Sequence, residues 1–205
     1  MPEDESAILF PVPAKLFVLV FFLAPPVVLA AAAPPFASSS PPAETSAWRE
    51  KVTEMLPLLG HRNWIAIVDS AYPLQVSPGV ETVETNSSLI GVLHFVLGAI
   101  GHSEHVGPEI FMDAELPFLT EQDAPGAARY RANVADVLRG YPVQSMLHDK
   151  IIADLDQTGR TFQVLVLKTN LTIPYSSVFI RLNCKYWGND AERRLREKMA
   201  GRSGH

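Results

Sequence analysis

Short apolar runs alternate with amphipathic segments along residues 47–188, and only a few residues separate one from the next. Runs of about four to eight residues rich in β-branched and aromatic side chains are typical of buried strands. Strands that alternate with helices over short connections favour a mainly parallel or mixed sheet flanked by helices. The sequence therefore predicts a single α/β domain over residues 47–188.

The expected elements follow from periodicity and from turn-forming or capping residues. Strands are expected over residues 64–69, 80–85, 106–113, 143–147, 161–167 and 178–182. Helices are expected over residues 48–59, 89–101, 127–139, 148–155 and 190–200. We expect Ser46 to cap the first helix and Gly60 to end it. The last helix lies in a charged C-terminal tail, residues 189–205.

The N-terminal segment differs from the rest of the chain in charge and periodicity. No charged residue occurs between Lys15 and Glu44, and this stretch is apolar and then rich in Pro, Ser and Ala. The pattern predicts a signal peptide-like leader over residues 1–33 and a Pro/Ser-rich linker over residues 34–46. The protein is then expected to be secreted or periplasmic. An uncleaved membrane anchor and a start codon assigned too far upstream are the alternatives, because the charged residues before Lys15 are all acidic, whereas a signal peptide usually begins with basic residues.

The composition excludes several classes of function. The net charge of −5 disfavours a nucleic-acid partner. Cys184 is the single cysteine, so the chain has neither an internal disulfide nor a Cys-x-x-Cys motif. The sequence contains no GxGxxG, P-loop, GxSxG or HExxH pattern. We therefore expect no nucleotide or other cofactor.

Three of the six histidines are close together in the sequence. His102 and His105 flank Glu104, and His94 lies eight residues before His102. A metal site is one interpretation, and solvated histidines at a helix end are the other. No neighbouring residues are arranged to orient these rings as metal ligands require, so we predict no metal site.

His61 and Asp69 flank the first expected strand. Five strand residues between them span about 17 Å at ~3.3 Å per residue. The two side chains are thus expected at opposite ends of one strand. If both act in one pocket, either a neighbouring subunit supplies one of them or the loops fold back.

The residues around this strand form a recognisable motif. Gly60-His61, a short spacer, an apolar strand and then Asp69-Ser70-x-x-Pro73 resemble the opening motif of the D-ribose pyranase/L-fucose mutarotase family.

Three later segments extend this resemblance in the same order. Residues 128–133 (ARYRAN) are similar to a helix of the fucose branch, and residues 147–150 (LHDK) to the ribose branch. Residues 173–180 (IPYSSVFI) resemble the family's closing strand. The similarity covers about residues 47–188.

The resemblance implies an activity and a set of site residues. Family members exchange anomers or ring forms of free monosaccharides without a cofactor, in homo-oligomeric rings with sites between subunits. By motif position, His61 would be the acid/base residue, and the substrate-binding residues would be Asp69, His148, Tyr175 and Ser177. Ser177 stands where the family usually has asparagine.

The sequence thus predicts an isomerase, a sugar mutarotase or pyranase acting on a fucose- or ribose-like monosaccharide. Two alternatives remain open. One is a non-catalytic exported sugar-binding protein of the same fold, and the other is a structural or interaction domain with a vestigial pocket.

Overall fold

The computed structural model describes residues 44–202. The predicted leader over residues 1–33 and most of the predicted linker lie outside the described residues, so both remain predictions. Within residues 44–202, no helix has the length and hydropathy needed to cross a membrane.

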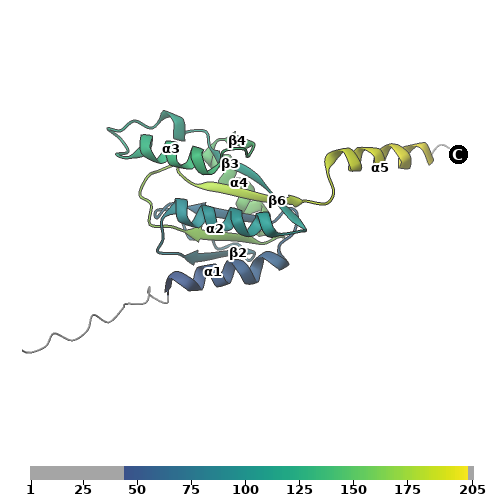
Figure 1. Cartoon of the computed structure of the whole chain (residues 1–205), viewed down its shortest axis with the longest axis horizontal. Helices are drawn as coiled ribbons and strands as arrows, with labels where there is room; N and C mark the ends of the chain where they lie inside the picture. The colour runs from purple at the N-terminus through teal and green to yellow at the C-terminus, as the bar shows by residue number, and fades with distance from the viewer. Residues whose placement is uncertain (1–43, 203–205) are drawn as a thin grey trace, which may run out of the picture. The chain divides into compact units, whose positions relative to one another are not determined.

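The described residues form one α/β domain, as predicted (Figure 1). The helices are α1 (Glu44–Met55), α2 (Leu89–His102), α3 (Ala127–Val137), α4 (His148–Gly159) and α5 (Asn189–Arg202). The strands are β1 (Trp64–Val68), β2 (Val80–Glu84), β3 (Val106–Asp113), β4 (Val143–Met146), β5 (Val164–Lys168) and β6 (Val178–Cys184). Short 3₁₀ helices follow α1 and β3, at η1 (Leu56–Leu58) and η2 (Leu116–Phe118).

Some element boundaries differ from the expected ones. α1 begins at Glu44, so Ser46 lies inside the helix and the prediction that it caps the helix was wrong. α1 gives way to η1 after Met55, because Pro57 has no amide hydrogen to continue the α-helical pattern. Ser88 caps α2, since its Oγ accepts a hydrogen bond from the backbone N–H of Gly91 at 3.2 Å.

The six strands form one mixed sheet in the order β2-β5-β1-β6-β3-β4. β6 pairs antiparallel with both β1 and β3, and the other pairings are parallel. The carboxyl ends of β1 to β5 therefore meet at one edge of the sheet, and β6 begins there. The first residue of β6, Val178, pairs with Ile67 of β1 and Met112 of β3.

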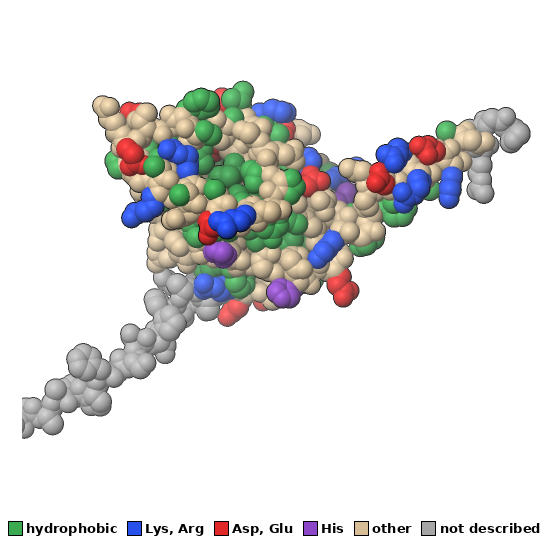
Figure 2. Space-filling model, turned by 45° about the horizontal axis from the view of Figure 1, so that its top comes forward, with side chains coloured by type: hydrophobic (Ala, Val, Ile, Leu, Met, Phe, Trp, Pro, Cys, Tyr) green, Lys and Arg blue, Asp and Glu red, His purple; other side chains and the backbone are tan. Residues whose placement is uncertain are grey.

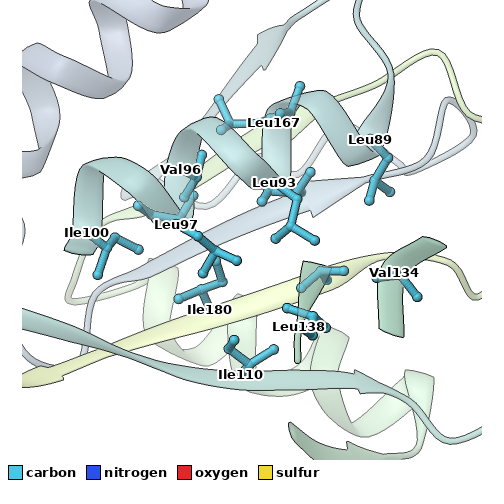
Figure 3. Packing of buried hydrophobic residues seen from close by; sticks show 14 of the residues in the cluster. Leu89, Leu93, Val96, Leu97, Ile100, Ile110, Val134, Leu138, Leu167 and Ile180 are labelled. Carbon is cyan, nitrogen blue, oxygen red and sulfur yellow. The ribbon is translucent and has the colours of Figure 1, made fainter. Parts of the chain in front are cut away.

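Apolar side chains cover both faces of the sheet. α1, α2 and α3 pack on one face, where Leu93 and Val96 of α2 lie over Ile110 and Ile180 of the sheet (Figure 3). α4 packs on the other face through Ile151 and related residues. Each fully buried aliphatic side chain contributes roughly 1.5–3 kcal/mol of transfer free energy. This double burial holds the strand ends, and the polar residues on them, in fixed positions.

The tail helix is charged, as predicted. Figure 2 shows side chains of both signs close together along α5, and two of its ion pairs join Arg193 to Asp190 and Arg196 to Glu192. Exposed ion pairs of this kind contribute about 0–1 kcal/mol each.

Candidate functional site

Polar side chains gather at the edge where the parallel strands end. Asp69 follows β1, Asp113 is the last residue of β3, and His148 begins α4 shortly after β4. Ser177 precedes β6, which lies between β1 and β3. The carboxyl edge of an open α/β sheet is where ligands of such folds usually bind.

Asp69 makes two contacts through its carboxylate. Oδ1 accepts a hydrogen bond from the backbone N–H of Ala71 at 2.8 Å, which fixes the turn after β1. Oδ2 lies 3.5 Å from the hydroxyl oxygen of Ser177, which is fully buried. The sheet topology therefore brings Asp69 and Ser177 together from positions far apart in the sequence.

His148 is held at two points by acidic residues that end or follow β3. Its ring Nδ1 lies 3.1 Å from Asp113 Oδ1. Its backbone N–H lies 3.1 and 3.2 Å from the two carboxylate oxygens of Glu115. Because His148 is the first residue of α4, Glu115 also places a negative charge at the positive end of that helix.

The aromatic ring of Tyr175 lies against the ring of His148. The two ring centroids are 5.3 Å apart and the planes are nearly perpendicular, at 88°. Tyr175 has a positive φ of 53°, a conformation that costs a non-glycine residue of order 1–3 kcal/mol. The surrounding chain thus keeps Tyr175 beside His148 despite local strain.

Asp113 is a buried carboxyl group that is only partly satisfied. Its side chain is 2% exposed, and within residues 44–202 its Oδ2 has no hydrogen-bond partner. Burial is the main cause that raises the pKa of Asp113, and the negative charges of Glu115 and Asp69 also raise it. The contact with His148 lowers it, and the resulting pKa is about 6. Near neutral pH the carboxylate form therefore predominates and can accept the Nδ1 proton of His148.

These residues border a hollow of about 440 Å³, which we call the carboxyl-end hollow. Its lining consists of residues 69–73, His148 and residues 172–175. The volume lies within the range of about 300–1,000 Å³ typical of small-molecule sites. Three of the predicted substrate-binding residues, Asp69, His148 and Tyr175, line it, and Ser177 lies buried behind Asp69.

Two other tyrosines near this edge have structural partners. The hydroxyl of Tyr130 donates to the carbonyl oxygen of Ser176, and that of Tyr72 donates to Gln75 Oε1 at 2.9 Å. Burial raises the pKa of both hydroxyls above the ordinary value, and the negative charges of the nearby aspartates add to the effect. Both tyrosines therefore stay neutral and fix the loops around the hollow.

His61 lies away from this hollow. It is exposed in the turn before β1, and it lines a second hollow of about 660 Å³, which we call the His61 hollow. Arg62, Glu109, Arg181 and Trp187 line that hollow as well. As the spacing along β1 requires, one chain does not bring His61 and Asp69 together.

Two of the three histidines considered for a metal site, His102 and His105, have partners within the protein. His102 Nδ1 lies 2.7 Å from the carbonyl oxygen of Gly98. His105 contacts Ser103 Oγ through Nδ1 at 2.9 Å and the carbonyl oxygen of Leu59 through Nε2 at 3.0 Å. In the described part of the chain, no three His, Cys, Asp or Glu side chains are grouped as a metal ion would need.

Asp113 and Glu115 were missed at the sequence level. Asp113 ends one strand, and Asp69 directly follows another. The order of the strands places both strand ends at one edge of the sheet. That shared signal could have identified Asp113. Its pairing with His148 depends on β3 and β4 being neighbours, which the sequence does not state.

Comparisons with known proteins agree in fold type. No family model matches the chain, and no curated protein sequence matches it. Among solved structures, Bacillus subtilis RbsD complexed with D-ribose is 13% identical, with a TM-score of 0.48, and the match covers 65% of this chain and 91% of that one.

Two further structures are similar to a comparable degree. The fucose mutarotase of Streptococcus pneumoniae in complex with L-fucose is 16% identical, with a TM-score of 0.44, over 69% of this chain and 95% of that one. FucU from Bifidobacterium longum is 14% identical, with a TM-score of 0.42, over 65% of this chain and 94% of that one.

Proposed function

We propose that the protein is a cofactor-free isomerase that exchanges anomers or ring forms of a free monosaccharide at the carboxyl-end hollow. One observation carries the proposal. Asp69, His148, Tyr175 and Ser177 were selected from separate sequence motifs, and the fold gathers them at one edge of the sheet around or behind one hollow.

The side chains of the hollow suit a polyhydroxylated ring. Carboxylate oxygens such as those of Asp69 accept hydrogen bonds from hydroxyl groups strongly because they are charged. The half-exposed ring of Tyr175 offers an apolar surface for the C–H face of a sugar. A site with few polar groups on an apolar lining holds such a ligand in one orientation.

The reaction needs two proton transfers and little else. A base removes the proton of the anomeric hydroxyl, an acid protonates the ring oxygen, and the bond from the anomeric carbon to the ring oxygen breaks to give an open-chain aldehyde. Closure from the other face, or by another hydroxyl, gives the new form. A positioned acid or base contributes typically 10²–10⁴-fold to such a step.

We place His61 in this site as a proton-transfer group supplied by a neighbouring copy of the chain. His61 is exposed, and histidine is the side chain type most often used for proton transfer in catalysis. His61 and Asp69 lie at opposite ends of β1, which supports a site formed between subunits of a homo-oligomer, as the sequence resemblance implies.

Export remains part of the proposal. Mass spectrometry of the native N-terminus tests it, because removal of the leader would leave a chain that starts after about residue 33. An intact Met1 or Pro2 on the soluble protein would contradict export.

Saturation-transfer NMR on a panel of free pentoses and 6-deoxyhexoses tests the activity. We expect one sugar to show protein-dependent exchange between its ring forms or anomers, above the rate in buffer. Binding without faster exchange would favour the non-catalytic sugar-binding protein. Neither binding nor exchange for any sugar of the panel would contradict a sugar site.

A further inference from the structure

We propose that Asp113 is a positioning residue that fixes the proton of His148 on Nδ1, so that Nε2 serves as the base of the carboxyl-end hollow. The inference deepens the proposed function and rests on it. It adds a residue that neither the motifs nor the sequence resemblance selected.

Two neighbouring acidic residues fix His148 in position and orientation. Asp113 is anchored at the end of a central strand and is almost completely buried, so its carboxyl group has little freedom. Glu115 holds the backbone of His148, and Asp113 holds its ring. Two contacts from one strand end therefore fix both the position of the residue and the orientation of its imidazole.

The hydrogen bond also determines which nitrogen is free. An ionised carboxylate only accepts hydrogen bonds, so Nδ1 must carry the proton that it shares with Asp113. The lone pair of the neutral ring is then on Nε2, and His148 lines the hollow. Within residues 44–202, Nε2 has no hydrogen-bond partner of its own, which leaves it free to accept a proton.

Asp113 is surrounded by groups that influence its charge from several elements. The negative charges of Asp69, after β1, and Glu115, before η2, oppose its ionisation, while His148 of α4 favours it. The hydroxyls of Tyr72 and Tyr130 also lie within its electrostatic range. Carboxyl groups whose pKa is raised by burial towards neutral pH occur more often at functional sites than elsewhere.

The resulting step is balanced. Nε2 of His148 takes the proton of the anomeric hydroxyl, and the electrons of that O–H bond form the carbonyl double bond. The bond from the anomeric carbon to the ring oxygen breaks, and its electron pair goes to the ring oxygen. That oxygen takes a proton from the acid, for which His61 of a neighbouring copy is the proposed group. Ring closure reverses these transfers.

The test compares Asp113→Asn with Glu115→Gln in the full chain. Both variants remove a negative charge near His148. Asp113→Asn removes the charge that contacts the ring, and Glu115→Gln removes the charge that contacts the backbone N–H. We expect Asp113→Asn to lower the exchange rate at saturating sugar by about 10-fold or more, with a smaller change in sugar affinity. Glu115→Gln should lower the rate less than Asp113→Asn does, because glutamine keeps an oxygen that can accept the backbone N–H of His148.

The dependence of the rate on pH provides a readout that a merely structural residue would not move. The wild-type rate should rise with pH through a midpoint near 6, the pKa of Asp113. In Asp113→Asn this midpoint should move or the rise should disappear, whereas in Glu115→Gln the rise should remain with its midpoint shifted downward, because that variant removes one of the charges that raise the pKa of Asp113. A wild-type rate and pH profile in Asp113→Asn would overturn the inference.

Nitrogen-15 NMR of the histidine rings separates this inference from the activity itself. The His148 signals are assigned by their loss in His148→Gln. In the sugar-free wild type the ring proton should lie on Nδ1 at pH 7.5, which is about 1.5 units above the midpoint expected for Asp113 and His148 together. Asp113→Ala should no longer hold it there. A proton on Nε2 in the wild type would refute the inference. If no sugar exchanges, the proposed function fails, and the tautomer still decides whether Asp113 positions His148.

Discussion

The two hollows at opposite ends of β1 are built in different ways. At the carboxyl end, Asp113 and Ser177 are buried, and they contact His148 and Asp69, respectively. At the other end, His61 is exposed. The carboxyl-end hollow thus has polar groups held in place by buried partners, whereas the His61 hollow is larger and its histidine is exposed.

The charges of the two hollows differ as well. In the His61 hollow, Arg181 forms an ion pair with Glu109, and its guanidinium lies 5.8 Å from the ring centre of Trp64 and 5.2 Å from that of Phe111. Such half-exposed pairs tolerate substitution at a cost of about 0–1 kcal/mol. The carboxyl-end hollow instead contains buried groups whose removal leaves a partner unsatisfied. A chemical centre is therefore better supported at the carboxyl end, and only the proposed function gives the other end a part, as the source of a proton donor for a neighbouring copy.

The largest effect is expected from His61→Asn. Asparagine keeps a similar size and some hydrogen bonding but has no group that titrates near neutral pH. The exchange rate should fall about 100-fold or more while sugar affinity changes little. Equilibrium binding and saturation-transfer rates measure the two quantities. Full activity in this variant would assign the His61 hollow no part in the reaction.

The pKa of Asp113 predicts how stability responds to pH. Burial raises it from the reference value of 3.8 to about 6, so the folded state favours the neutral acid. This contribution to stability is fully present below about pH 4 and is lost as the pH rises through about 6, with a magnitude on the order of 3 kcal/mol.

Denaturant unfolding of the wild type and Asp113→Asn at pH 4 and pH 7 measures this effect. The variant has no titrating group at position 113, so the wild type should gain stability relative to it as the pH falls from 7 to 4. The same difference between the two proteins at both pH values would contradict a raised pKa.

Asp69→Asn should have a moderate effect that falls mainly on binding. An amide can still contact a sugar hydroxyl, but it lacks the charged acceptor. We expect affinity to weaken by about 10-fold and the exchange rate of bound sugar to change less. Part of the backbone contact with Ala71 survives, so the melting temperature serves as the control. A loss of rate with unchanged affinity would instead give Asp69 a direct role in proton transfer.

The smallest effect is expected from His102→Ala, with chelator treatment as a parallel test. The ring of His102 contacts the carbonyl of Gly98 within its own helix and lines neither hollow. Its replacement should leave affinity and exchange rate within about twofold of the wild type, as surface substitutions usually do. Loss of activity in the variant or with the chelator would restore the metal-site interpretation.

The sequence predicted the fold better than the site. Periodicity predicted β1 nearly residue for residue, because burial on both faces leaves an apolar run with sharp ends. The ends of the helices were less certain, since α1 begins before Ser46 and α4 continues to Gly159. Local sequence does not show where a helix loses its packing partner.

The sequence selected individual candidate residues, but it did not show most of their contacts. Asp69 and His148 followed from motifs close to each residue in the sequence. The contact between His148 and Asp113 depends on the pairing of β3 with β4, and the contact between Ser177 and Asp69 depends on β6 lying antiparallel beside β1. Such pairings join distant segments, so spacing along the chain cannot specify them.

A mixing experiment tests most directly whether the two ends act together in one site. His61→Asn and Asp69→Ala are each expected to be nearly inactive, and each retains the end that the other lacks. If one copy supplies His61 and its neighbour supplies Asp69, subunits mixed in equal amounts and reassembled should recover about one quarter of the wild-type exchange rate. A mixture that stays as inactive as its components, although light scattering shows that mixed oligomers have formed, would contradict a site shared between subunits.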